Sequence, residues 1–172
     1  MEGFLNPSEV LKQLKLRKDM IACDFGCGSG GWVIPLAKKL EEGNVFAIDI
    51  LEEPLSALRS RAKSEKIFNI ETRKADVEKW THLLNESCDL VLMTNLLFEV
   101  EDKKKVLEEA RRVLKPRGEI LIVDWLKDNP LTPTIEFCST EEIKKIADEI
   151  GLKLGKEFEA GLYHWGLIFQ KQ

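Results

Sequence analysis

The sequence predicts an α/β protein, built as a doubly wound, seven-stranded, mostly parallel sheet with an antiparallel last strand. Three observations support this. Short apolar runs alternate with segments whose apolar residues recur at helical spacing. The first run, residues 20–25, leads into a glycine-rich loop of the kind that binds nucleotides. The last two apolar segments, 152–159 and 163–170, are joined by so short a link that they must be antiparallel.

Helices are expected where capping residues or one-sided apolar patterns occur. Asn6 is a good N-cap, Pro7 suits the first helical position, and Glu9 completes a capping box. Gly43 and Gly151 are suitable helix stops. The other predicted helices have an apolar face and cover residues 32–40, 54–62, 103–114 (ended by 115–118), 141–150 and, as a short helix and loop, 78–86.

Strands are expected where apolar runs end at turn residues. They cover residues 20–25, 44–49, part of 67–74, 88–94, 119–124, 152–159 and 163–170. The proline-containing stretch 128–134 is expected to be a loop. No linker, internal repeat or low-complexity segment interrupts the pattern, so residues 1–172 are expected to form a single domain.

Composition restricts the partners and the compartment. A net charge of −4 argues against a general attraction to nucleic acid or anionic lipid, and the basic residues at 103–105 and 111–112 are balanced by neighbouring acids. Neither a signal peptide nor a membrane-length apolar run is present, so we expect a cytoplasmic protein with no membrane partner. The cysteines lack zinc-site spacing, so we expect reduced thiols and no metal.

The glycine loop fits two ligand classes. Gly26, Gly28 and Gly31 match G-x-G-x-x-G, which is typical of dinucleotide binding, whereas Gly26, Gly28 and Gly30 match G-x-G-x-G. Asp24 stands two residues before the first glycine, where an acid would repel a pyrophosphate but could help to hold an ammonium group. Asp24 therefore favours the second pattern, while a purely structural Asp that caps the loop stays open as an explanation.

The second pattern, residues 24–30, resembles motif I of the class I S-adenosylmethionine-dependent methyltransferases. Residues 89–100 and 107–124 resemble later motifs of the small-molecule, ubiquinone-biosynthesis-like (type 11) group. Two differences are that Arg117 stands where a glycine is usual and that no histidine lies near Phe98. The resemblance covers nearly the whole chain, and it implies the Rossmann-like methyltransferase fold with S-adenosyl-L-methionine as the cofactor.

Ligands of a doubly wound sheet bind beyond the carboxyl ends of the strands. Asp49 ends the second strand, where a carboxylate can accept hydrogen bonds from two ribose hydroxyls or cap the next helix. Asp76 follows the third strand, where it could accept a hydrogen bond from the adenine amine beside the backbone N–H of Val77. The residues and the resemblance together imply a cofactor site made of Asp24, Gly26, Cys27, Gly28, Gly30, Asp49, Ile50, Leu51, Asp76, Val77, Asn95 and Leu96.

The acceptor of the methyl group is expected at the same edge of the sheet. Because the last strand runs antiparallel, its start brings Tyr163 and His164 towards Phe98 and Trp125. These four are the candidate substrate residues, with the loop 128–137 beside them, although each could equally be a packing residue. No catalytic base is evident, and a neutral amine or a thiolate acceptor would need none.

The sequence therefore predicts an S-adenosylmethionine-dependent methyltransferase that acts on an unidentified small molecule. One alternative is a catalytically idle S-adenosylmethionine-binding subunit that assists another chain. Another is an NAD-linked oxidoreductase, although the antiparallel ending of the sheet counts against it. We expect a monomer or a homodimer, or else a partner chain that completes the active site.

Overall fold

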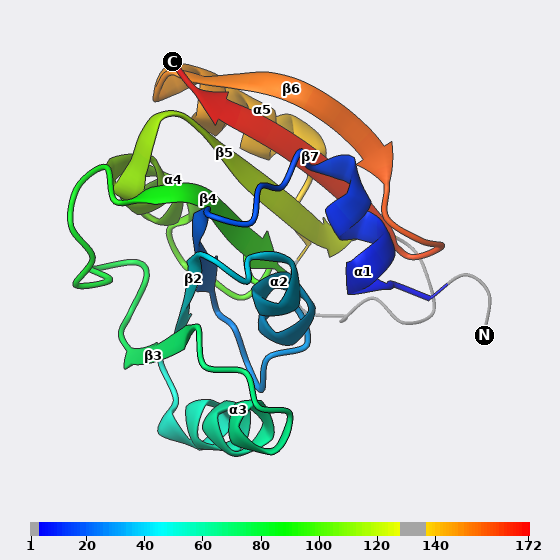
Figure 1. Cartoon of the computed structure of the whole chain (residues 1–172). Helices are drawn as coiled ribbons and strands as arrows, with labels where there is room; N and C mark the ends of the chain where they lie inside the picture. Colours follow the sequence, from blue (N-terminus) through cyan, green and yellow to red (C-terminus); the bar gives the residue numbers. More distant parts are fainter. Residues whose placement is uncertain (1–3, 128–136) are drawn as a thin grey trace.

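The computed structural model describes residues 4–127 and 137–172, which form one seven-stranded sheet flanked by helices (Figure 1). The strands are β1 (Ile21–Phe25), β2 (Asn44–Asp49), β3 (Ile70–Lys74), β4 (Cys88–Thr94), β5 (Leu114–Trp125), β6 (Leu152–Glu159) and β7 (His164–Lys171). Their order in the sheet is β3–β2–β1–β4–β5–β7–β6. β1 to β5 pair in parallel, and β7 runs antiparallel to both β5 and β6. The predicted fold class is confirmed.

Helices cover both faces of the sheet, because the central strands are apolar on both sides. They are α1 (Pro7–Val10), followed by the 3-10 turn η1 (Leu11–Gln13), α2 (Val33–Lys39), α3 (Glu52–Ser64), α4 (Lys103–Val113) and α5 (Thr140–Glu149). Leu92 and its neighbours pack against α1, α2 and α3, whereas Val91 and its neighbours pack against α4 and α5. Figure 1 shows α1 and α2 on the near side of the sheet and α5 on the far side.

Side-chain caps begin α1 and α5, and the one at Asn6 was predicted. The side chain of Asn6 accepts hydrogen bonds from the backbone nitrogens of Ser8 (3.0 Å) and Glu9 (3.4 Å). Ser139 accepts from the backbone nitrogen of Glu142 at 3.1 Å and starts α5. α3 begins two residues before Pro54, a position in its first turn where a missing N–H costs nothing.

The predicted short helix within 78–86 is wrong. The backbone nitrogen and hydroxyl of Thr81 both donate to Glu109, at 2.8 and 2.6 Å. Arg73 donates to the carbonyl of His82 at 2.7 Å, and His82 itself has φ 61°. These tertiary hydrogen bonds fix an irregular path that no local pattern indicates. The predicted helix stop at 115–118 is also wrong, because Leu114 is already extended and β5 begins there.

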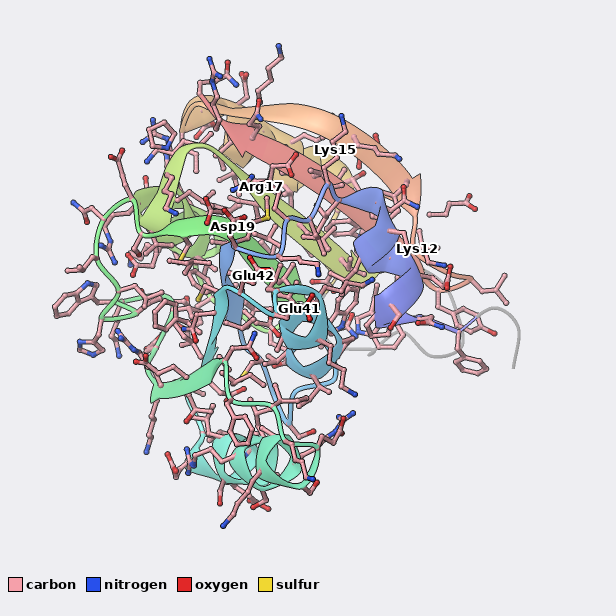
Figure 2. All side chains as sticks on the ribbon, in the orientation of Figure 1. Lys12, Lys15, Arg17, Asp19, Glu41 and Glu42 are labelled. Atoms are coloured by element: carbon pink, nitrogen blue, oxygen red, sulfur yellow. The ribbon has the colours of Figure 1, made fainter. Side chains whose placement is uncertain are left out.

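One charged surface lies where residues 12–19 pass the turn between α2 and β2 (Figure 2). Arg17 donates to Asp19 at 3.2 Å, and Lys18 pairs with Glu41. Acids of residue 19 and of the turn at 41–42 thus lie among the cations of residues 12–18, so this surface lacks the uniform positive charge that a nucleic-acid backbone requires. The described chain includes no helix with both the length and the apolar character needed to span a bilayer. All four cysteines are buried thiols.

Candidate functional site

The loop between β1 and α2 is shaped by glycines in left-handed conformations. Gly26, Gly28 and Gly30 have φ of 69°, 53° and 90°, which other residues rarely adopt. A Cβ on Gly30 would overlap the side chain of Leu58, whereas a Cβ on Gly31 would meet no atom within 4 Å. The backbone therefore requires a glycine at position 30 and not at position 31. This is the G-x-G-x-G pattern, not the dinucleotide pattern.

Asp24 lies under this loop as an unpaired buried carboxylate. Its side chain is 1% exposed, and neither oxygen has a hydrogen-bond partner among the residues that the structure describes. Burial, and then the nearby charge of Asp49, hold the pKa of Asp24 well above its usual range. Burying a charge without a partner is costly. A cationic group bound above the loop would remove that cost, so the arrangement fits an ammonium-bearing ligand.

Asp49 joins the end of β2 to the glycine loop. One carboxylate oxygen accepts from the backbone nitrogen of Gly28 at 2.9 Å, and the other accepts from that of Leu51 at 3.0 Å. The loop is further fixed by the backbone nitrogen of Cys27, which donates to Ile48 at 2.8 Å. A carboxylate can accept about four hydrogen bonds, so Asp49 keeps capacity for two ligand hydroxyls.

A cleft of about 330 Å³ opens at the carboxyl ends of the strands. Eight of the predicted cofactor residues line it: Gly26, Asp49, Ile50, Leu51, Asp76, Val77, Asn95 and Leu96. The other four, Asp24, Cys27, Gly28 and Gly30, belong to the strand and loop beside it and do not line it. Ile50 and Leu51 are 56% and 61% exposed, so apolar surface is available there for a flat ring.

Asp76 is held at one end of this cleft. Its oxygens accept from the backbone nitrogen of Glu78 at 3.0 Å and pair with Lys79 at 3.1 Å. The hydrogen bond from Lys79 holds the pKa of Asp76 below its usual value, so this carboxylate is ionised at neutral pH. Sequence reasoning missed further residues that line the cleft after β3 and β4, although the strand-end rule could have found them: Glu78, Glu99 and Val100.

Asn95 comes directly after β4 in a left-handed conformation with φ 50°. Its backbone nitrogen donates to the carbonyl of Val123 at 2.8 Å, which fixes the turn. Within residues 4–127 and 137–172, the buried side-chain oxygen of Asn95 has no hydrogen-bond partner, so a polar acceptor remains available beside the cleft. Leu96 packs over Gly26, whose added Cβ would lie 2.8 Å from it.

The predicted acceptor residues divide between two places. Trp125 and His164 stack on the α1 side, with ring centroids 4.1 Å apart, and Tyr163 packs edge-on against Phe4 at 6.0 Å. Phe98 is instead half-buried and packs against the core on the α4 side. None of these predicted residues lines the 330 Å³ cleft, and residues 128–136 of the predicted acceptor loop lie outside the described residues.

Asp124 is a residue at this edge that sequence reasoning did not single out. It is 1% exposed and accepts from the backbone nitrogens of Leu97 (3.0 Å) and Trp125 (2.8 Å). Burial raises the pKa of Asp124 to about 6. Its hydrogen bonds tie the segment after β4 to the end of β5. An acid at the end of an apolar strand was the available signal.

In the described ranges, no three His, Cys, Asp or Glu side chains could together hold a metal.

Comparisons with known proteins agree with this geometry. The family model described as a methyltransferase domain matches residues 16–161. A demethylmenaquinone methyltransferase of Listeria welshimeri is 30% identical over 70% of this chain, which spans only about half (51%) of that relative. Phosphoethanolamine N-methyltransferase 1 of Arabidopsis thaliana is 28% identical over 83% of this chain and 28% of its own length. A crystal structure of an Aquifex aeolicus SAM-dependent methyltransferase superposes with TM-score 0.88 at 30% identity, covering 98% and 90% of the two chains.

Proposed function

Because this chain belongs to the methyltransferase domain family, whose cofactor in the similar solved structure is S-adenosylmethionine, we propose that it transfers a methyl group from that cofactor to a small-molecule acceptor. The observation that carries the proposal is the unpaired carboxylate of Asp24, buried beneath three left-handed glycines. Buried there, Asp24 ionises only at a cost unless a cation lies beside it, and the methionine end of the cofactor has an ammonium group. A pyrophosphate would add a second negative charge there.

The residues around the cleft would divide the work of holding the cofactor. Asp24 attracts the ammonium group, Asp49 accepts hydrogen bonds from the ribose hydroxyls, and Asp76 accepts from the adenine amine. Ile50 and Leu51 cover the faces of the adenine. When bound, S-adenosylmethionine supplies a methyl group activated by the positive charge on sulfur. The task left to the chain is to align the acceptor with that methyl group and to exclude water.

The aromatic side chains on the α1 side favour a flat acceptor. Trp125 and His164 stack there, and Tyr163 lies against Phe4. The Listeria and Arabidopsis relatives are named for different acceptors, a quinone and an amine. A quinol ring would suit the stacked pair, and a hydroxyl group on it would find a neutral imidazole, since burial lowers the pKa of His164 to about 4.

The test combines calorimetry with a turnover assay. We expect S-adenosylmethionine and S-adenosylhomocysteine to bind, and NAD not to bind. We then expect S-adenosylhomocysteine to be released with a naphthoquinol lacking the ring methyl and not with phosphoethanolamine. Turnover of the amine instead would overturn the flat acceptor and keep methyl transfer. Cofactor binding without any turnover would favour an idle partner subunit, and binding of NAD alone would favour an oxidoreductase.

A further inference from the structure

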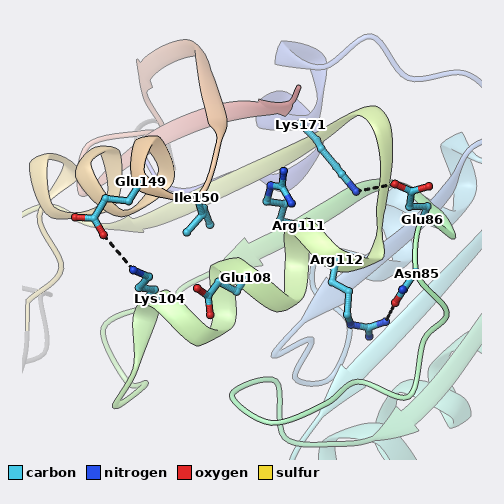
Figure 3. A pocket seen from close by; sticks show the side chains of 9 residues that line it. All are labelled: Asn85, Glu86, Lys104, Glu108, Arg111, Arg112, Glu149, Ile150 and Lys171. Carbon is cyan, nitrogen blue, oxygen red and sulfur yellow. Dashed lines mark hydrogen bonds and ion pairs between the residues drawn. The ribbon is translucent and has the colours of Figure 1, made fainter.

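A second cavity, of about 590 Å³, lies away from the cofactor cleft, beside the amino-terminal ends of β4 and β5 (Figure 3). It opens between α4, the end of α5, the segment before β4 and the last residues of β7. Four cationic side chains line it: Lys104, Arg111, Arg112 and Lys171. The proposed methyl transfer uses none of them.

Three of these cations already have partners. The pairs are Lys104 with Glu149, Lys171 with Glu86, and Arg112 with Glu109. Arg111 differs, because it forms no ion pair with any residue that the structure describes, and its buried Nε has no hydrogen-bond partner. A buried donor left unpaired lowers stability, and a charged one costs more than a neutral one. Arg111 is therefore the group in this cavity that still needs an anion.

The surroundings of Arg111 leave room for such an anion. The guanidinium lies beside Gly151, where an added Cβ would meet its Nη2 at 3.7 Å and its Nε at 3.9 Å, so no side chain of residue 151 stands between the group and the cavity. In Figure 3, Arg111 points into the space between Ile150 and Lys171, the end of Lys171 is turned towards Glu86, and the carboxylate of Glu108 points towards Lys104. The nearest acid on the same helix is thus directed away from the space in front of Arg111.

Lys171 can provide the second positive charge. It is only 7% exposed, and its Nζ donates to the carbonyl of Leu114 at 2.7 Å, which fixes its position. Its partner Glu86 is 54% exposed and 3.2 Å away, so solvent reaches the carboxylate of that ion pair. One fixed ammonium and one planar guanidinium suit an anion with several oxygens.

We propose that this cavity binds a phosphate-type oxyanion, with Arg111 as the principal ligand and Lys171 as the second. The volume leaves space for the organic part of a small phosphorylated molecule beside the anion. The competing explanation is that Arg111 only stabilises the negative end of the α5 dipole, next to Gly151. That explanation predicts an effect of Arg111 on stability and none on anion binding.

The test is calorimetric titration of the full chain with inorganic phosphate and with glycerol 3-phosphate, in chloride buffers of constant ionic strength. We expect phosphate to bind with a Kd on the order of 1 mM. Arg111→Gln should weaken phosphate binding about tenfold or more, because the charged guanidinium and its paired hydrogen bonds are lost. Arg111→Lys keeps the charge and should weaken binding less. Lys153→Gln, an equal loss of charge on the exposed part of β6, should leave binding unchanged.

The titrations distinguish failure of the proposal from the two possible classes of anion. No heat beyond the chloride control, or equal losses in the Arg111 and Lys153 variants, would overturn the proposal. Tighter binding of glycerol 3-phosphate than of phosphate would identify a phosphorylated metabolite as the ligand class, and the reverse order would identify the free ion. S-adenosylhomocysteine binding should be the same in all variants, so failure of the proposed function would be recognised independently.

Discussion

The imidazole of His164 stacks on the indole of Trp125 with centroids 4.1 Å apart and an interplanar angle of 36°. The antiparallel register pairs these two residues at the end of β5 and the start of β7. In the described part of the chain, neither nitrogen of His164 has a hydrogen-bond partner, although the residue is only 4% exposed. Burying these two nitrogens without partners lowers the stability of the folded state, as expected where a ligand supplies the missing hydrogen bond.

His164→Phe should stabilise the protein, and most strongly in acid. Burial lowers the pKa of His164 to about 4, so the unfolded chain binds its proton more readily below pH 6.5 and the folded state loses stability as pH falls. Phenylalanine removes this loss, on the order of 1–2 kcal/mol at pH 5. Urea unfolding at pH 5 and pH 8 measures it. An equal change at both pH values would mean that the folded imidazole is not held neutral.

Asp24→Asn should separate stability from cofactor binding. The unfolded chain ionises Asp24 freely at pH 8, whereas burial makes ionisation costly in the folded state, so removing the group should raise the unfolding temperature of the unliganded protein at pH 8. It also removes the partner of the ammonium group, so S-adenosylhomocysteine affinity should fall about 10- to 100-fold, the equivalent of 1.4–2.8 kcal/mol. Asp19→Asn, an exposed acid just before β1, is the control and should change neither quantity. Unchanged affinity in the Asp24 variant would contradict our placement of the cofactor.

Gly30→Ala and Gly31→Ala form a matched pair. Gly30 has φ 90° and faces Leu58, so alanine there should destabilise the protein by about 2 kcal/mol or more and weaken cofactor binding. Gly31 has open space around it, so alanine should cost about 0.5 kcal/mol or less. Thermal unfolding and calorimetry of both variants give the comparison. Equal effects would show that the loop relaxes around either substitution.

Asp124 should make stability fall as pH rises from about 4 to about 6. Its pKa is raised to about 6 by burial, so in this range the folded state keeps a proton that the unfolded chain has released. The unfolding free energy of wild type minus that of Asp124→Asn should fall by about 1.4 kcal/mol per pH unit in this range, and it should level off above pH 6. Urea titrations at pH 4, 5, 6 and 7 measure it. A difference that grows with pH would mean that the hydrogen bonds from Leu97 and Trp125 outweigh burial.

The sequence predicted those parts of the fold that local patterns decide. The limits of β2 and β4 agree with the apolar runs 44–49 and 88–94, because turn residues end both runs. The path of 78–86 could not be predicted, because Glu109, far along the chain, holds Thr81. The same holds for the start of β5, which depends on the pairing of Leu114 with Cys88.

The site was predictable to a similar extent. The strand-end rule brought Asp49, Asp76 and Asn95 to one cleft, since topology alone places them there. Nothing in the sequence shows that Asp24 lacks a hydrogen-bond partner or that Phe98 packs against the core, because both depend on side-chain packing. The charged cavity could not be predicted either, because Arg111 and Lys171 come from distant parts of the chain.

The position of β7 has a consequence for biosynthesis. β6 contacts the rest of the sheet only through β7, although β6 is translated first. A nascent chain that has emerged from the ribosome as far as residue 163 therefore holds an unpaired β6 and an open edge on β5. Folding of this half must wait for residues 164–171, and until then both strands offer exposed backbone to chaperones or to other nascent chains.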